Sequence, residues 1–179
     1  MGSGLQSDPY GEYDTMFSCN DYHYEVQFLP PMAPGPGLAH LCIQQHICLV
    51  LTYDASSRES WDEMTAAYER IRSRCPEGDL PFLATMIAAM GAEGGSQAVS
   101  REEGEAFANQ RGCLFVEYSP TTGRGLRSAV GSLVELAYGA RRQFPAYPSG
   151  VRPGEPLPSQ AERERLLKRG EAIQGLFAE

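Results

Sequence analysis

The chain has 179 residues, a formal net charge of −8 and 42% hydrophobic residues, values typical of a globular chain with one main domain. Its longest apolar stretch, near residues 47–51, is far shorter than the ~20 residues of a bilayer-spanning helix. Residues 1–10 lack the pattern of a secretory signal. Of the 15 basic residues 14 are arginine, and the only lysine is Lys168. Chemistry that needs a lysine elsewhere in this sequence is therefore excluded.

The charge distribution limits the classes of binding partner that we expect, and the cysteine pattern indicates the cellular compartment. Residues 1–140 carry 8 basic and 18 acidic side chains, so this body would repel a phosphate backbone, and no nucleic-acid partner is predicted. The tail, residues 141–179, is too weakly basic for a strong membrane-surface arm. The five cysteines are scattered and odd in number, which indicates reduced thiols in a cytoplasmic protein.

One group of histidine and cysteine residues lies close enough in sequence to be considered as a metal site. His40, Cys42, His46 and Cys48 fall within nine residues, whereas zinc sites usually use two separated pairs that can close a tetrahedron. Cys48 also begins an apolar run that should be buried. We predict no metal, and we predict no Cys–His nucleophilic site because the sequence shows no orienting group or pocket.

The first third of the chain is predicted to contain two strands. Residues 1–15 are polar and rich in turn signals, and we see no strand among the first 20 residues. Residues 22–29 alternate and are aromatic-rich, which predicts a strand. The Pro- and Gly-rich residues 30–37 predict a loop and residues 38–45 a short helix. Residues 46–53 form an apolar run typical of a strand buried on both faces.

Helices and strands then alternate. Capping boxes begin at Ser60 and Ser100. Together with the apolar spacing they predict helices at 60–75, 100–112 and 126–144, and strands at 81–87 and 113–118. Residues 145–160 predict a Pro-rich linker, and residues 161–179 an amphipathic helix. This order predicts an α/β fold in three layers, a mostly parallel sheet with helices on both faces.

Several stretches, in the same order, resemble the Ras superfamily of small GTPases, in its Ras and Rab branches. Residues 53–64 (YDASSRESWDEM) resemble the passage after the second switch, and residues 7–15 (SDPYGEYDT) the first-switch effector segment. Residues 99–125 (VSREEGEAFANQRGCLFVEYSPTTGRG) are the most specific part. The resemblance implies a P-loop-NTPase-like fold over residues 16–144, preceded by the first-switch-like segment 1–15.

The nucleotide motifs of that family are missing or altered in this sequence. The P-loop pattern Gly-x4-Gly-Lys-Ser/Thr does not occur, and Tyr10 stands where the magnesium-ligating threonine is expected. No carboxylate occurs between Glu25 and Asp54 for the Asp-x-x-Gly motif. We place the base-reading Asn-Lys-x-Asp motif on residues 87–90 (Ile-Ala-Ala-Met). Only Ser119 survives of Ser-Ala-Lys, so Ser119 is the one residual nucleotide-binding candidate, and no catalytic residue is assigned.

The same resemblance places the family's first strand between the strands at 22–29 and 46–53. This sequence lacks that strand, the P-loop and the first helix. We therefore expect the two flanking strands to close up, a partner to supply a strand, or the fold to be incomplete, as in a truncated gene product.

Two functions follow from the resemblance. The first is a degenerate, pseudo-GTPase domain that binds no GTP, GDP or magnesium and acts through protein partners of effector or regulator type. The aromatic, acidic segment with Tyr10, Glu12, Tyr13 and Asp14, and the edge around residues 22–25, are the expected contact surfaces. The second is a GTP-hydrolysing small GTPase whose P-loop is missing from this sequence. No cysteine follows Cys113, so no prenyl anchor and no stable membrane attachment are expected.

Overall fold

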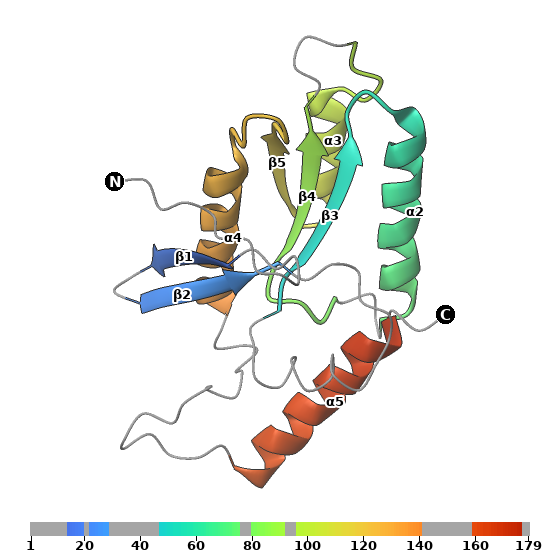
Figure 1. The fold of residues 1–179 in the computed structure, drawn as a ribbon. Helices are drawn as coiled ribbons and strands as arrows, with labels where there is room; N and C mark the ends of the chain where they lie inside the picture. Colours follow the sequence, from blue (N-terminus) through green and yellow to red (C-terminus); the bar gives the residue numbers. More distant parts are fainter. Residues whose placement is uncertain are drawn as a thin grey trace.

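The computed structural model describes residues 14–19, 22–28, 47–75, 80–91, 96–140 and 159–176. Its central element is a parallel three-stranded sheet in the order β3-β4-β5 (Figure 1). The strands are β3 (Leu49–Asp54), β4 (Thr85–Met90) and β5 (Leu114–Tyr118). Helices follow each strand, and this alternation gives the parallel pairing expected for β–α–β units. The predicted α/β class is confirmed.

The helices cover both faces of this sheet, as predicted. Helices α2 (Arg58–Ser73) and α3 (Arg101–Gln110) lie on one face, and α4 (Leu126–Ala140) lies on the other (Figure 1). Helix α5 (Gln160–Leu176) packs near the end of the sheet at which the strands begin, where Ile173 and Leu176 are buried. None of the helices in the described residues is both long and apolar enough to span a membrane.

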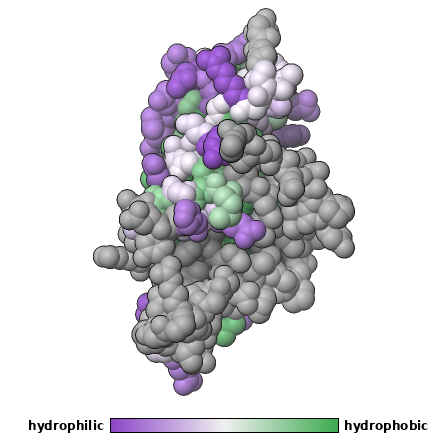
Figure 2. Space-filling model, turned by 60° about the vertical axis from the view of Figure 1, so that its left-hand side comes forward, coloured by the Kyte–Doolittle hydropathy of each residue, from purple (hydrophilic) through white to green (hydrophobic). Residues whose placement is uncertain are grey.

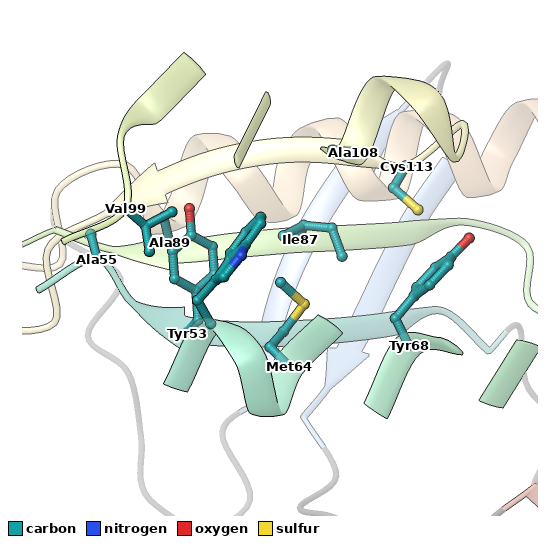
Figure 3. Close-up of a cluster of buried hydrophobic side chains, with 10 residues drawn as sticks. Tyr53, Ala55, Met64, Tyr68, Ile87, Ala89, Val99, Ala108 and Cys113 are labelled. Carbon is teal, nitrogen blue, oxygen red and sulfur yellow. The ribbon is translucent and has the colours of Figure 1, made fainter. Parts of the chain in front are cut away.

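The main core lies between the sheet and helices α2 and α3. Trp61, Met64 and Tyr68 on α2 pack against Tyr53 and Ile87 of the sheet (Figure 3). Their spacing of three and four residues gives the helix one apolar face. The rings of Tyr53 and Trp61 meet edge to face at 4.8 Å between centroids, a favourable aromatic geometry. Helix α2 is therefore fixed over β3.

A separate hairpin corrects one prediction. Strand β1 (Asp14–Cys19) pairs antiparallel with β2 (Tyr22–Gln27) in a sheet of its own, so the expectation of no strand before residue 20 was wrong. Successive side chains of a strand point to opposite faces, so Phe17 points inward and Met16 outward. Only two residues separate β1 from β2, and a two-residue connection is the commonest one in β-hairpins. The boundary expected between residues 15 and 16 falls inside β1.

The hairpin packs against α4. Phe17 lies near Gly131 and under the guanidinium of Arg127, at 5.2 Å, and the rings of Tyr24 and Tyr138 meet edge to face at 6.4 Å. Within the described residues neither β1 nor β2 pairs with β3. Of the three alternatives given above, the closing-up of β2 against β3 does not occur in this part of the chain, where β3 pairs only with β4.

The surface is largely hydrophilic where it is described. Figure 2 shows hydrophilic side chains over much of the described upper part of one face, around a smaller apolar area. The large apolar side chains that are exposed in the described residues are Met16, Leu136 and Leu167. Scattered apolar residues of this kind are normal on a globular protein.

Several element boundaries differ from the predictions: the strands expected from residues 46 and 81 begin at Leu49 and Thr85. Helix α2 begins at Arg58, two residues before Ser60, because Ser57 is its N-cap and accepts a hydrogen bond from the Ser60 amide at 3.2 Å. Strand β4 ends three residues after residue 87, because the apolar run continues with Ala88 and Ala89, both fully buried. Helix α3 begins as predicted, with Ser100 as its N-cap.

Several predictions lie outside the described residues. These are the loop at 30–37, the helix at 38–45, most of the linker at 145–160, and the histidine and cysteine cluster except Cys48.

Candidate functional site

A pocket opens at the end of the sheet where the parallel strands finish. In open α/β sheets, ligands bind outside the carboxyl ends of the strands. This pocket has a volume of ≈ 460 Å³. Its walls come from the end of β5, the segments that flank β4 and α3, and the first turns of α4. They comprise Gly91, Gln97, Arg101, Val116, Glu117, Tyr118, Ser119, Arg124, Gly125, Ser128, Ala129 and Ser132.

Ser119, the one predicted nucleotide-binding residue, lines this pocket. Its side chain is buried, and its hydroxyl accepts a hydrogen bond from the Thr122 amide at 3.2 Å. The Ser119 amide donates to the Arg124 carbonyl at 2.9 Å, and the Ser119 carbonyl accepts from the Gly123 amide at 2.8 Å. These bonds close the turn between β5 and α4. The structure thus gives Ser119 a role in shaping the pocket wall.

Two glycines complete that turn. Gly123 and Gly125 have φ values of 68° and 87°, a left-handed backbone that glycine adopts without steric cost. Gly125 also lies against β5, because a Cβ there would come within 2.5 Å of the Glu117 carbonyl oxygen. The close approach sets the first turn of α4, with Ser128 and Ser132, against the pocket.

An ion pair occupies one side of the pocket. Arg101 Nη1 lies 2.7 Å from Glu117 Oε2, and Arg101 Nε lies 3.9 Å from the Glu105 carboxylate. Arg101 is 58% exposed and Glu117 is 28% exposed, so solvent weakens the pair. The pair nonetheless connects the start of α3 to the end of β5. It also means that Glu117, the acidic side chain of the pocket wall, already has an ionic partner within the chain.

Tyr53, in the main core, lies in a buried and acidic environment. Burial raises the pKa of Tyr53 to about 12, and the carboxylates of Glu117 and Glu103 add to the rise. A tyrosine with this pKa stays protonated throughout the physiological range. Tyr53 is therefore a neutral core residue and no proton-transfer group.

Cys75, Cys113 and His23 make hydrogen bonds within the fold. Burial raises the pKa of the Cys113 thiol, which lowers its thiolate fraction and hence its reactivity. Cys75 is buried, and its thiol donates to the Ile71 carbonyl at 3.3 Å. His23 contacts Ser18 Oγ at 2.9 Å on the exposed hairpin. No group of three or more metal-binding side chains occurs among the described residues.

The structure also corrects the position of the base-reading segment. Ile87, Ala88 and Ala89 lie inside β4 and are buried in the two cores, so they cannot face a nucleotide. The strand ends at Met90, and Gly91 then lines the pocket and donates its amide to the Tyr118 carbonyl at 2.9 Å. The segment that follows the strand therefore starts at Gly91, four residues after the predicted start of the motif at residue 87.

Sequence reasoning missed most of the residues that build this pocket. Arg101 lies in the helix predicted at 100–112 and Glu117 in the strand predicted at 113–118, and neither was singled out as a site residue. A signal was present, because Glu117 lies near the carboxyl end of a predicted parallel strand. Of the predicted partner-binding residues, Asp14 begins β1 opposite Gln27. Tyr10, Glu12 and Tyr13 lie outside the described residues.

The parallel sheet with helices on both faces makes this an α/β domain, compatible with a P-loop-NTPase-like fold. The Ras family model matches residues 37–138, more than half of the chain. The chain belongs to the Ras family, as its sequence motifs had implied. No curated protein matches the chain.

Proposed function

We propose that this Ras-family protein acts as a protein-binding module and does not hydrolyse GTP. The observation that carries the proposal is the place of its only lysine. In the related fold, lysines hold the nucleotide phosphates and stack on the base, which is largely how these proteins position and stabilise the transferred phosphoryl group. Lys168 lies on α5, which packs at the end of the sheet where the strands begin (Figure 1). The pocket lies at the other end, where the strands finish.

The pocket supports the same proposal. Its Glu117 carboxylate is paired with Arg101, and its Ser119 hydroxyl is bonded to the turn it closes. Each charged hydrogen bond that a ligand cannot make costs ~1.5–3 kcal/mol of affinity. Because Glu117 and Ser119 already make these bonds within the protein, a guanine base would have to compete for them.

Isothermal titration calorimetry tests the nucleotide half of the proposal. The purified chain is titrated with GDP and with GTP in the presence of magnesium, and we expect no heat of binding. Micromolar binding of either nucleotide would instead favour the second candidate, a GTP-binding small GTPase. That candidate has one observation in its favour, the pocket of ≈ 460 Å³ at the carboxyl edge of the sheet.

Protein contacts are proposed at the N-terminal segment. Tyr10, Glu12, Tyr13 and Asp14 combine aromatic and acidic groups that suit a basic or mixed protein surface. Asp14 begins a hairpin whose outward face carries the exposed Met16 and Glu25, directly opposite each other. This arrangement continues the proposed contact surface along β1.

Site-specific photocrosslinking in cells tests the partner surface. A photoreactive residue in place of Tyr13 should give discrete crosslinked protein products. The same residue in place of Glu135, which is exposed on α4, serves as the control and should give none. Equal product patterns at both positions, or no product at Tyr13, would contradict the proposed surface.

A further inference from the structure

The edge of β3 is open in the described part of the chain. Strand β3 pairs only with β4 there, so its other edge has no strand partner. Residues 49–53 of this strand contain no proline and no charge, although edge strands usually carry such groups to prevent pairing. Its side chains also resemble those of an interior strand, since Leu49 and Tyr53 are buried and Val50 is half-buried.

Hydrogen bonds fix which backbone groups of β3 are available. The Leu49 amide donates to the Ala84 carbonyl and the Ala55 amide to the Met90 carbonyl, both at 3.0 Å. Successive residues of a strand point their backbone groups to opposite sides, so those of Val50 and Thr52 point away from β4. Asp54 also points away, but Ser60 already bonds its amide and its carbonyl, at 3.0 and 3.1 Å.

These two residues suit pairing with a second copy of the same strand. If two β3 strands run antiparallel about Leu51, Val50 of each copy lies opposite Thr52 of the other. Opposed residues of this type exchange two N–H···O=C bonds. The two residue pairs would together use the amide and the carbonyl of both Val50 and Thr52 in each copy. A two-fold axis relates the two copies, which is the commonest symmetry of protein dimers.

Helix α2 adds a complementary surface beside this edge. Ser60, Glu63, Ala67 and Arg70 follow one another at helical spacing and form one stripe. Because Ser60 bonds the outward backbone groups of Asp54, this stripe lies on the side of the open edge. The opposite side of α2 faces α3, where Arg58 and Glu69 pair with Glu103 and Arg111, each at 2.7 Å.

The stripe is self-complementary in an antiparallel pair of helices. Glu63 lies near the start of the stripe and Arg70 near its end, and the small residues Ala66 and Ala67 lie between them in the sequence. The two charged side chains are exposed and form no ion pair within the described residues. A two-fold axis would place Glu63 of one copy beside Arg70 of the other, twice, while the alanines let the two helices approach.

We propose that this protein forms a homodimer through the open edge of β3, with α2 of each copy packed antiparallel against the other. The two β3 strands then join two three-stranded sheets into one sheet of six strands. Neither β3 nor α2 lines the pocket at the carboxyl edge of the sheet, and the hairpin packs on α4, so this interface does not depend on the proposed function.

Charge reversal tests the interface directly. Sedimentation equilibrium of the full 179-residue chain should show a dimer. Glu63→Arg and Arg70→Glu should each raise the dimer dissociation constant about tenfold, because each places like charges together twice. The double variant Glu63→Arg/Arg70→Glu restores opposite charges and should return the dissociation constant close to the original value. Glu135→Arg on α4 is the control and should leave it unchanged.

A second measurement examines the strand edge itself. The amides of Val50 and Thr52 should be protected from hydrogen exchange in the dimer and should lose that protection on dilution. Thr52→Pro removes one of the proposed donors at an edge position that tolerates proline, and it should yield a folded monomer by circular dichroism. A monomeric wild-type chain, a dimer that ignores the charge reversals, or protection of these amides at every dilution would each overturn the proposal.

Discussion

Gly125 lies directly against the backbone of Glu117, so close that a Cβ at Gly125 would come within 2.5 Å of the Glu117 carbonyl oxygen. Gly125 also has a φ of 87°. The two facts make this position doubly specific for glycine, and they fix the first turn of α4 beside the pocket.

Gly125→Ala should therefore destabilise the fold by about 1–3 kcal/mol, the usual range for a residue held in a strained backbone region. Gly139→Ala is the control in the same helix, because a Cβ there meets nothing within 4 Å. It should be neutral or stabilise by up to ~1 kcal/mol. Chemical denaturation of both variants measures the free energies of unfolding, and equal values would contradict this role of Gly125.

Gly104→Ala tests the packing of α3 on the sheet. A Cβ at this position would collide with the Tyr53 hydroxyl and come within 2.6 Å of the Phe115 ring. We expect a loss of about 1–3 kcal/mol, as in overpacked cores. Combining it with Tyr53→Phe removes only the hydroxyl contact, so the pair should show partial rescue in a double-mutant cycle. Strict additivity would show that Tyr53 does not limit the space at Gly104.

Ser57→Ala tests the observed start of α2. The Ser57 side chain accepts from the Ser60 amide at 3.2 Å, and loss of such a cap costs about 0.5–2 kcal/mol. Ser73→Ala, at the exposed end of the same helix, should change the free energy of unfolding much less. If the two substitutions had equal effects, Ser57 would not be the N-cap.

Stability should fall at strongly alkaline pH because of two buried tyrosines. Burial raises the pKa of both Tyr53 and Tyr68 from 10.0 to about 12. The unfolded chain therefore releases these protons at lower pH than the folded chain. Their contribution is complete below pH 10 and is lost as pH rises from about 10 to about 12. Urea denaturation across this range should show a smaller loss for Tyr53→Phe than for the wild type.

The sequence predicted those features that depend on local pattern. The Ser100 cap and the apolar spacing of Trp61, Met64 and Tyr68 identified two helices, because capping and periodicity are properties of neighbouring residues. The motifs at 99–125 also identified the family. Strand β1 was missed because only three of its six residues are apolar and they do not alternate regularly, so the strand depends on pairing with β2 and packing on α4.

The site was less predictable, because it depends on contacts between distant segments. The Arg101–Glu117 pair joins residues 16 positions apart, and no local pattern couples them. Residues 87–90 were assigned to the base-reading motif by the order of motifs in the resemblance, which does not fix where a strand ends. Burial of Ile87, Ala88 and Ala89 between α4 and the α2–α3 core continues the strand to Met90.

The central claim, that this Ras-family chain works without bound nucleotide, is tested most directly by thermal unfolding with and without GDP and magnesium. A ligand present at one hundred times its dissociation constant adds about 2.7 kcal/mol of stability, which would raise the unfolding temperature by several degrees. We predict one cooperative transition at the same temperature under both conditions. A rise in that temperature that grows with GDP concentration would contradict the claim.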